Sequence, residues 1–248
     1  MKTRIERRDV LKLMTAGAAM AALPRTLRAA GKKPAKAAGP NVVLIFADDQ
    51  GYQDMGCFGS PKIKTPNLDQ MAKEGMRFTD FYSACSVCSP SRAALLTGCY
   101  PPRVGVTRVL FPRDHAGLNP KETTIADLLK TRGYATACVG KWHIGHLPQF
   151  LPTSQGFDSY FGIPYSNDMT IAKNMTAAPG AKLPAGMTAE TLKTAKAKKN
   201  HVPLLRDTKV VEYPCDQTML TKRYTAEAIR FITANTDKPF FLYMPHTM

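Results

Sequence analysis

A run of seven residues at positions 41–47, NVVLIFA, limits most strongly what this chain can fold into. After Asn41 the run is apolar throughout and rich in β-branched residues, which is typical of a central parallel strand buried on both faces of its sheet. Segments 134–140 and 240–244 have a similar character and follow helix-forming stretches. Strands that alternate with helices predict an α/β fold with a central, mostly parallel sheet flanked by helices. The length of 248 residues suits one such domain or two small ones.

Other segments have the periodicity of helices or strands. Apolar residues at helical spacing predict helices over 65–74, 123–132 and 217–235, the second of which should bury Ile125, Leu128 and Leu129. Alternation of apolar and polar residues predicts a strand over 76–82.

Two adjacent carboxylates, Asp48 and Asp49, come directly after the first predicted strand. Ligand sites in open parallel sheets gather at the carboxyl ends of strands, so this pair is well placed to bind a hard cation such as Ca²⁺ or Mg²⁺. A solvated acidic turn would have the same two residues. The pair alone does not distinguish a metal site from such a turn.

A second candidate site lies at the start of a predicted helix that begins near Cys88 and is capped by Gly98. Free N–H groups and the helix dipole favour negative charge at Cys88, and Arg92 adds a full positive charge one turn later. This arrangement predicts a reactive group that faces an anionic substrate. The alternative is an inert, buried cysteine ahead of a core helix.

Lys141 and His143 follow the predicted strand 134–140 on a loop that has glycine on either side. A cation and an imidazole at the end of a strand supply what charge neutralisation and proton transfer require. Either residue alone would equally suit a surface lysine or a packed histidine.

Two of these segments resemble the signatures of the type I sulfatase family. Residues 88–98, CSPSRAALLTG, resemble the first signature, whose Cys-x-Pro-x-Arg core directs oxidation of the cysteine to Cα-formylglycine. Residues 133–143, GYATACVGKWH, resemble the second, and residues 150–168 are most similar to the arylsulfatase A-like branch. The resemblance implies an alkaline-phosphatase-like sandwich and hydrolysis of sulfate esters of aryl alcohols or carbohydrates.

The resemblance also implies a nucleophile and a metal site. Cys88, once converted to Cα-formylglycine, would attack sulfur as the aldehyde hydrate. Asp48, Asp49 and the modified Cys88 would bind Ca²⁺, with Mg²⁺ as the alternative. The enzyme that generates formylglycine would then be a partner of this protein.

The remaining implied roles concern charge, protons and the sulfate group. Arg92 and Lys141 would neutralise charge and orient the hydrate, and His143 would assist proton transfer. Lys141 and Ser166 would contact the sulfate. Asn167 stands where arylsulfatase A has a histidine, so contacts beyond the sulfate are expected to differ.

The first 40 residues have the character of an export leader. Arg7 and Arg8 precede a weakly apolar run at 13–23, a pattern that resembles a twin-arginine signal. We therefore expect a signal peptide over 1–30, a linker over 31–40 and a periplasmic or secreted protein. The apolar run is too short for a membrane span. A basic, disordered tail is the alternative.

The formal net charge of +15 is concentrated in two places. Residues 1–40 contribute +8 and residues 173–209 contribute +6, and neither stretch contains a nucleic-acid-binding motif. We therefore expect no nucleic-acid partner. Residues 173–209 are predicted to form a surface insertion whose charge attracts sulfated glycans or is simply solvated.

The resemblance places a catalytic histidine and further metal ligands beyond Met248. Residues 41–248 are therefore expected to be the N-terminal part of a catalytic domain and to be inactive alone. Two other functions remain open. They are a phosphodiesterase or phosphonate hydrolase of the alkaline phosphatase superfamily, and a sulfated-glycan-binding protein without catalysis.

Overall fold

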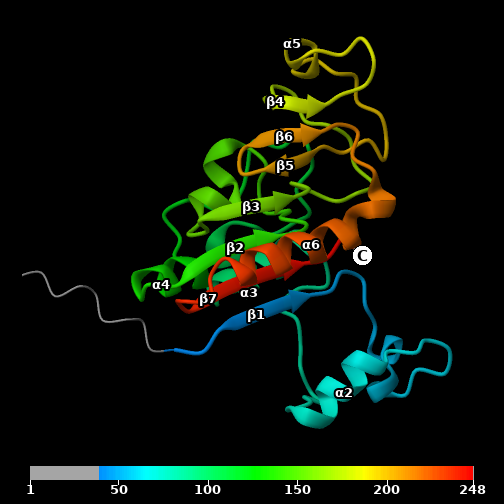
Figure 1. Ribbon diagram of the computed structural model, residues 1–248, viewed down its shortest axis with the longest axis vertical. Coiled ribbons are helices and arrows are strands. Elements are labelled where there is room, and N and C mark those ends of the chain that lie inside the picture. Colours follow the sequence, from blue (N-terminus) through cyan, green and yellow to red (C-terminus); the bar gives the residue numbers. More distant parts are fainter. Residues whose placement is uncertain (1–38, 248) are drawn as a thin grey trace, which may run out of the picture. The chain divides into compact units, whose positions relative to one another are not determined.

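The computed structural model describes residues 39–247, so the expected signal peptide and most of the linker lie outside the described residues (Figure 1). Seven strands form one sheet in the order β1-β7-β2-β3-β5-β6-β4. The strands are β1 (Val42–Phe46), β2 (Ala135–Val139), β3 (Ser159–Gly162), β4 (Ala177–Lys182), β5 (Leu204–Arg206), β6 (Lys209–Glu212) and β7 (Phe240–Pro245).

The sheet is mixed but mostly parallel. Strands β1, β7, β2 and β3 all pair in parallel, and β4 is parallel to β6. Strand β5 is antiparallel to both of its neighbours, β3 and β6. The predicted α/β class with a mostly parallel sheet is therefore confirmed. The carboxyl ends of β1, β7, β2 and β3 all lie at the same end of the sheet. Binding sites of parallel sheets form at this end.

Helices flank this sheet. Helix α6 packs against β2, β3 and β7, while α4 packs against β2 and against α3. Figure 1 shows α6 and α3 on opposite faces of the sheet. The helices are α2 (Pro66–Glu74), α3 (Cys88–Thr97), α4 (Ile125–Thr131), α5 (Ala189–Leu192) and α6 (Leu220–Thr233). Short 3-10 turns are η2 (Tyr52–Asp54), η3 (Gly56–Phe58), η4 (Pro101–Val104), η5 (Pro148–Phe150), η6 (Pro152–Ser154) and η7 (Gln217–Met219).

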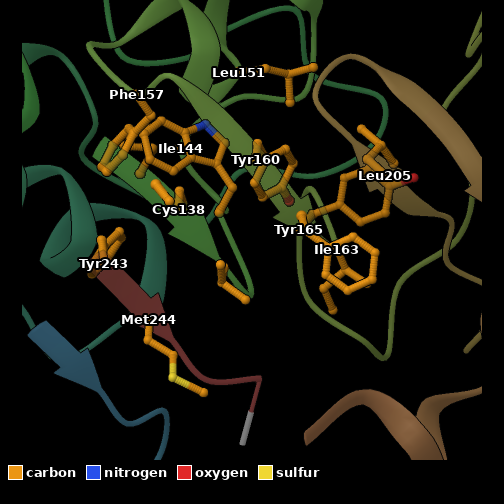
Figure 2. Packing of buried hydrophobic residues seen from close by; sticks show 14 of the residues in the cluster. Cys138, Ile144, Leu151, Phe157, Tyr160, Ile163, Tyr165, Leu205, Tyr243 and Met244 are labelled. Atoms are coloured by element: carbon orange, nitrogen blue, oxygen red, sulfur yellow. The ribbon is translucent and has the colours of Figure 1, made fainter. Parts of the chain in front are cut away.

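Aromatic side chains make up much of the core between these layers. The ring of Phe157 stacks on Phe241 and Tyr243 of β7 and meets the edge of Trp142. Figure 2 shows the side chains of Phe157, Cys138 and Tyr160 gathered close to β2 and β3. Trp142 is fully buried, and its Nε1 donates to the carbonyl oxygen of Phe150 at 2.8 Å. The buried ring and the hydrogen bond of Trp142 consequently fix the loop after β2.

Strand β1 differs from the prediction in its surroundings. It is parallel, as expected, but β7 is its sole strand neighbour within residues 39–247, and it lies at the edge of the sheet. The side chains of Val43 and Ile45 are 47% and 55% exposed because no element of the described chain covers that face. The expectation of a central strand buried on both faces is therefore wrong for this part of the chain.

Two smaller predictions also need correction. Residues 76–82 form no strand, and Phe78, Phe81 and Tyr82 are exposed because no neighbouring strand pairs with this extended segment. Helix α4 forms where expected, but Leu128 is exposed and Ala126 is fully buried in its place. The short α4 packs through its smallest side chain, which allows close approach to its neighbours.

The stretch 173–209 carries β4, α5 and β5, and it joins the sheet because β5 pairs with β3. Its core contacts include four side chains that are fully buried, Leu192, Val202, Leu204 and Leu205. Residues 196–200 between these anchors are exposed. None of the helices between residues 39 and 247 has the length and hydropathy that a membrane crossing needs.

Candidate active site

The loop that follows β2 places Lys141 and His143. The backbone N–H of Lys141 donates to the carbonyl oxygen of Pro245 at the end of β7, at 2.8 Å. The N–H of His143 donates to the carbonyl oxygen of Pro164, just beyond β3, at 3.1 Å. Since the loop is bonded to the ends of both neighbouring strands, its two functional side chains project from a fixed backbone.

Asp48, directly after β1, accepts hydrogen bonds from two buried cations. Its Oδ2 accepts from Lys141 Nζ at 3.0 Å and from Arg92 Nη2. Lys141 is 1% exposed and Arg92 is 0% exposed. Burial raises the pKa of Asp48, but the charges of Lys141 and then Arg92 outweigh burial and hold that pKa below its usual value. Asp48 is therefore a carboxylate at neutral pH.

Arg92 connects helix α3 to the segments at the ends of three strands. Besides its bond to Asp48, Nη1 donates to the carbonyl oxygen of Lys141 at 2.7 Å, and Nη2 donates to that of His246 at 3.2 Å. The guanidinium carbon also lies 5.4 Å from the centre of the Phe46 ring. One buried side chain of α3 therefore fixes the ends of β1, β2 and β7 relative to one another.

Cys88 is the first residue of α3, as predicted, and Gly98 caps the other end with φ of 67°. The Cys88 carbonyl oxygen accepts from Ser91 Oγ at 3.0 Å, and its side chain is half-buried. Within residues 39–247 the Cys88 Sγ makes no hydrogen bond. Cys88 lies one turn before Arg92 on the same helix, so the helix that positions Arg92 also positions Cys88.

His143 is buried and neutral. Its Nε2 lies 2.9 Å from the Leu110 carbonyl oxygen, which can only accept, so Nε2 carries the proton and Nδ1 carries the lone pair. Nδ1 is buried and has no hydrogen-bond partner among the described residues. Burial, and then the charge of Lys141, lower the pKa of His143 to about 3. The residue has φ of 61°, a conformation that non-glycine residues adopt rarely and that is common at functional sites.

The two other predicted residues are placed differently. Ser166 joins the cluster because its Oγ accepts from Lys141 Nζ at 3.3 Å. Asp49 is exposed, has φ of 53° and makes no ion pair with a described residue. The structure therefore brings Asp48, Arg92, Lys141 and Ser166 into direct contact. It places Cys88, Asp49 and His143 on the same segments without direct contact.

The residues present fit part of a site for a hard cation. Asp48 and Asp49 offer carboxylate oxygens, the ligand type that Ca²⁺ and Mg²⁺ prefer, and one Asp48 oxygen is already engaged by Arg92 and Lys141. Calcium takes about six to eight oxygens. Residues 39–247 contain no group of three or more His, Cys, Asp or Glu side chains that could hold a metal ion. These two carboxylates therefore supply an incomplete donor set.

Several contacts of the site could not be predicted from side-chain patterns. The acceptors for His143 and Arg92 are backbone carbonyl oxygens of Leu110 and His246, and no residue type marks a carbonyl. Another such contact involves Gln217, whose amide bonds to Asn167. Nothing in the sequence around Gln217, which lies one turn before α6, indicates that its side chain makes this contact.

Comparison with known proteins decides the family. Residues 40–248 match the family model described as Sulfatase. The chain belongs to the sulfatase family. This sulfatase sequence is 46% identical over 209 residues to arylsulfatase A of Homo sapiens, and 42% identical over 214 residues to arylsulfatase G of Mus musculus. Arylsulfatases are sulfuric ester hydrolases. The chain is also 41% identical over 223 residues to N-acetylgalactosamine-6-sulfatase of Mus musculus.

These alignments cover 82%, 83% and 82% of this chain but 40%, 40% and 38% of the three relatives, respectively. The sulfatase chain therefore spans about 40% of the length of the curated relatives that it matches.

Solved sulfatase structures resemble the described fold. Ps i-CgsB, solved in complex with k-i-k-neocarrahexaose, superposes with a TM-score of 0.67 at 35% identity, over 84% of this chain and 44% of that chain. The PsFucS1 sulfatase from Pseudoalteromonas sp. gives a TM-score of 0.64 at 29% identity, over 99% of this chain and 48% of that chain. The predicted alkaline-phosphatase-like architecture is thereby confirmed for the part that the chain covers.

Proposed function

We propose that this chain supplies the nucleophile and one wall of the active site of an enzyme that hydrolyses sulfate esters. The observation that supports this most strongly is the contact of Arg92 and Lys141 with Asp48. This contact brings together the two segments that resemble the sulfatase signatures, residues 88–98 and 133–143, and the aspartate that follows β1. Two buried cations at the carboxyl ends of parallel strands make a site for a small anion such as sulfate.

The nucleophile and the metal are the finer part of the proposal. Cys88, oxidised to Cα-formylglycine, supplies a hydrated aldehyde whose hydroxyl attacks sulfur. A divalent cation, Ca²⁺ or Mg²⁺, is held in part by Asp48 and Asp49 and supplies Lewis-acid polarisation of the sulfate oxygens. Modification of Cys88 makes a formylglycine-generating enzyme a required partner.

The described side chains supply charge and proton transfer. Lys141 and Arg92 neutralise the sulfate and the charge that develops on it, and Ser166 Oγ accepts from Lys141 beside the bound sulfate. The Nδ1 lone pair of His143 accepts a proton when sulfate leaves, since its tautomer is set by the Nε2–H bond to Leu110. A pKa of about 3 means that His143 is neutral at neutral pH, so its Nδ1 lone pair is free.

We propose further that the 248-residue chain does not turn over substrate alone. Asp48 and Asp49 are too few oxygen ligands for calcium, and the chain spans about 40% of its relatives' length. The missing ligands and the acid that protonates the leaving alcohol would come from sequence that matches the rest of those relatives.

The twin-arginine pattern supports export to the periplasm or beyond, with residues 1–30 as signal, 31–40 as linker and 41–248 as catalytic domain. This part of the proposal rests on residues 7–23 of the sequence, which lie outside the described residues.

The test uses the full-length protein produced together with a formylglycine-generating enzyme. We expect peptide mass spectrometry to find the aldehyde at position 88 and expect 4-nitrophenyl sulfate to be hydrolysed faster than the corresponding phosphate monoester or diester. Cys88→Ala should abolish turnover, whereas the matched control Cys85→Ala should retain it.

An unmodified Cys88 together with no hydrolysis of sulfate esters would refute the proposal. Preference for a phosphate diester would assign the site to phosphoryl transfer. Binding of sulfated glycan without turnover would indicate a binding protein.

A further inference from the structure

Gln217, the first residue of η7, connects the candidate site to a distant loop. Its Nε2 donates to the carbonyl oxygens of Asn167 and Asn200, each at 2.8 Å. Its Oε1 lies 3.4 Å from Asn167 Nδ2. Asn167 follows Ser166, which accepts from the buried Lys141. The Gln217 side chain therefore holds residue 200 close to the residues that are proposed to bind sulfate.

The loop that ends at Asn200 is fixed from both sides. Leu192 and Val202, which flank it, are fully buried. The N–H of Asn174 donates to the Lys193 carbonyl oxygen at 2.9 Å. The N–H of His201 donates to the Lys198 carbonyl oxygen at 3.1 Å and closes a turn. Residues 196–200 are consequently an exposed turn on a fixed base.

Three lysines of this turn, Lys196, Lys198 and Lys199, are exposed, and we name them the basic rim. Within residues 39–247 no carboxylate oxygen lies within ion-pair distance of their ammonium groups, whereas nearby Lys193 pairs with Glu190 at 2.9 Å. An ammonium group without a carboxylate partner remains available to an external anion.

Two exposed carboxylates oppose the basic rim. Asp168 follows Asn167, and Asp216 precedes Gln217 and accepts from Thr218. Three lysine charges exceed these two carboxylate charges by one. The surface beside the site is therefore net positive.

We infer that the basic rim binds a second anionic group of the substrate, which makes a multiply sulfated oligosaccharide the preferred substrate class. This inference rests on the proposed sulfatase function and extends it. One sulfate enters the cluster around Lys141, and further sulfates along the same glycan lie against Lys198 and Lys199. Fixed positive charge next to a site raises the local concentration of polyanions and favours ligands that reach both places.

The test uses the full-length protein, with 4-nitrophenyl sulfate as a reporter because it carries one anionic group and none for the rim. Fully sulfated and singly sulfated chondroitin hexasaccharides serve as competing ligands. The double variant Lys198→Gln, Lys199→Gln should raise the inhibition constant of the fully sulfated hexasaccharide about fivefold, from the modest free energy of exposed ion pairs. The KM for 4-nitrophenyl sulfate and the inhibition constant of the singly sulfated hexasaccharide should not change.

The matched control removes two exposed cations at the other end of the parallel strands. Arg132 and Lys238 precede β2 and β7, so Arg132→Gln, Lys238→Gln changes net charge equally without touching the rim. We expect this control to bind both hexasaccharides as the parent does. Gln217→Leu, which removes the hydrogen bonds to Asn167 and Asn200, should weaken binding of the fully sulfated hexasaccharide selectively.

Equal inhibition constants in the parent and the rim variant would overturn the inference and leave the lysines as a solvated turn. An equal effect in the Arg132, Lys238 control would also overturn it, since only net charge would then matter. Failure of the sulfatase proposal is distinguishable, because the reporter would not be hydrolysed. Calorimetric titration of the hexasaccharides into the parent and the variants would then still measure their affinity for the basic rim.

Discussion

Among single residues, the Arg92 guanidinium holds the site together more than any other group. It is fully buried and bonds to Asp48 and to the carbonyl oxygens of Lys141 and His246. Buried ion pairs contribute little over an apolar substitute, but removal of one partner leaves an uncompensated charge. The main effect of removing Arg92 on stability should therefore come from the buried groups that are left without its hydrogen bonds.

Arg92→Met in the full-length protein should lower the free energy of unfolding by about 3 kcal/mol, because two carbonyl oxygens lose their donor and Asp48 keeps Lys141 as its one cation. Arg92→Lys keeps the positive charge but lacks the planar guanidinium with its several donors. It should lower the free energy of unfolding by less than Arg92→Met does. Urea unfolding measures both. Arg230→Met, which breaks an exposed pair with Glu227, is the control and should cost under about 1 kcal/mol. If Arg92→Met is as stable as this control, Arg92 is not the organising residue.

His143 should make stability depend on pH. Its pKa is lowered by burial and then by Lys141 from 6.5 to about 3, so between these values the unfolded chain binds more protons than the folded one. Stability from this residue is complete above pH 6.5 and falls as pH falls, by about 2 kcal/mol at pH 5. Urea unfolding at pH 5 and pH 8 should show a smaller difference for His143→Gln. An unchanged difference would mean that His143 is protonated in the folded state.

Among the elements, β2 and β7 approach each other closely beside the site. Gly140 has φ of 139°, and a Cβ there would lie 1.9 Å from the Pro245 carbonyl oxygen. That same carbonyl accepts from the N–H of Lys141. The loop of Lys141 and His143 can therefore form only when residue 140 has no side chain.

Gly140→Ala should accordingly lower the free energy of unfolding by about 2–4 kcal/mol, through steric overlap and an unfavourable φ. Gly186 also has positive φ, at 78°, but a Cβ there meets nothing within 4 Å. Gly186→Ala is thus the matched control for φ alone and should cost only about 1 kcal/mol. Urea unfolding of both variants gives the comparison. Equal costs would show that Pro245 moves aside freely.

The elements also show what can be predicted from the sequence. Apolar runs correctly located β1, β2 and β7, and Gly98 correctly located the end of α3, because these are local preferences of the chain. The edge position of β1 was missed, since an apolar run contains no information about what flanks it. The contact of Arg92 with Asp48 joins residues 44 positions apart. Such a contact depends on how the elements pack and not on local pattern.

For the molecule as a whole, several large apolar side chains are exposed on β1 and on the segment that follows α2. Val43 and Ile45 are exposed beside the edge of β1 that pairs with no strand of the described residues, and Met76, Phe78 and Phe81 are exposed farther along. Apolar side chains in the same region, including Phe78 and Phe81, also line a hollow of about 520 Å³. A free strand edge beside apolar side chains is a template for pairing with another chain.

We therefore expect the 248-residue chain, produced alone, to self-associate as its concentration rises. Ile45→Lys should shift the distribution towards monomer, because a charge on an edge strand disfavours pairing. Analytical ultracentrifugation over a concentration series measures this. Ile229→Lys on α6 replaces an equally exposed isoleucine away from the edge and should change nothing. A monomer at all concentrations would contradict the expectation.

The pairing of β7 with both β1 and β2 also determines when the site can form during synthesis. Asn41 Oδ1 accepts from the N–H of Phe240, across 199 positions of the chain, and the loop after β2 closes on Pro245. A ribosome that adds about 5–20 residues per second needs roughly 8–30 seconds to travel from Cys88 to β7. Throughout that interval the segment around Cys88 has no completed sheet to dock on. An enzyme that acts on Cys88 as an extended peptide has its opportunity then, before the last strand closes the site.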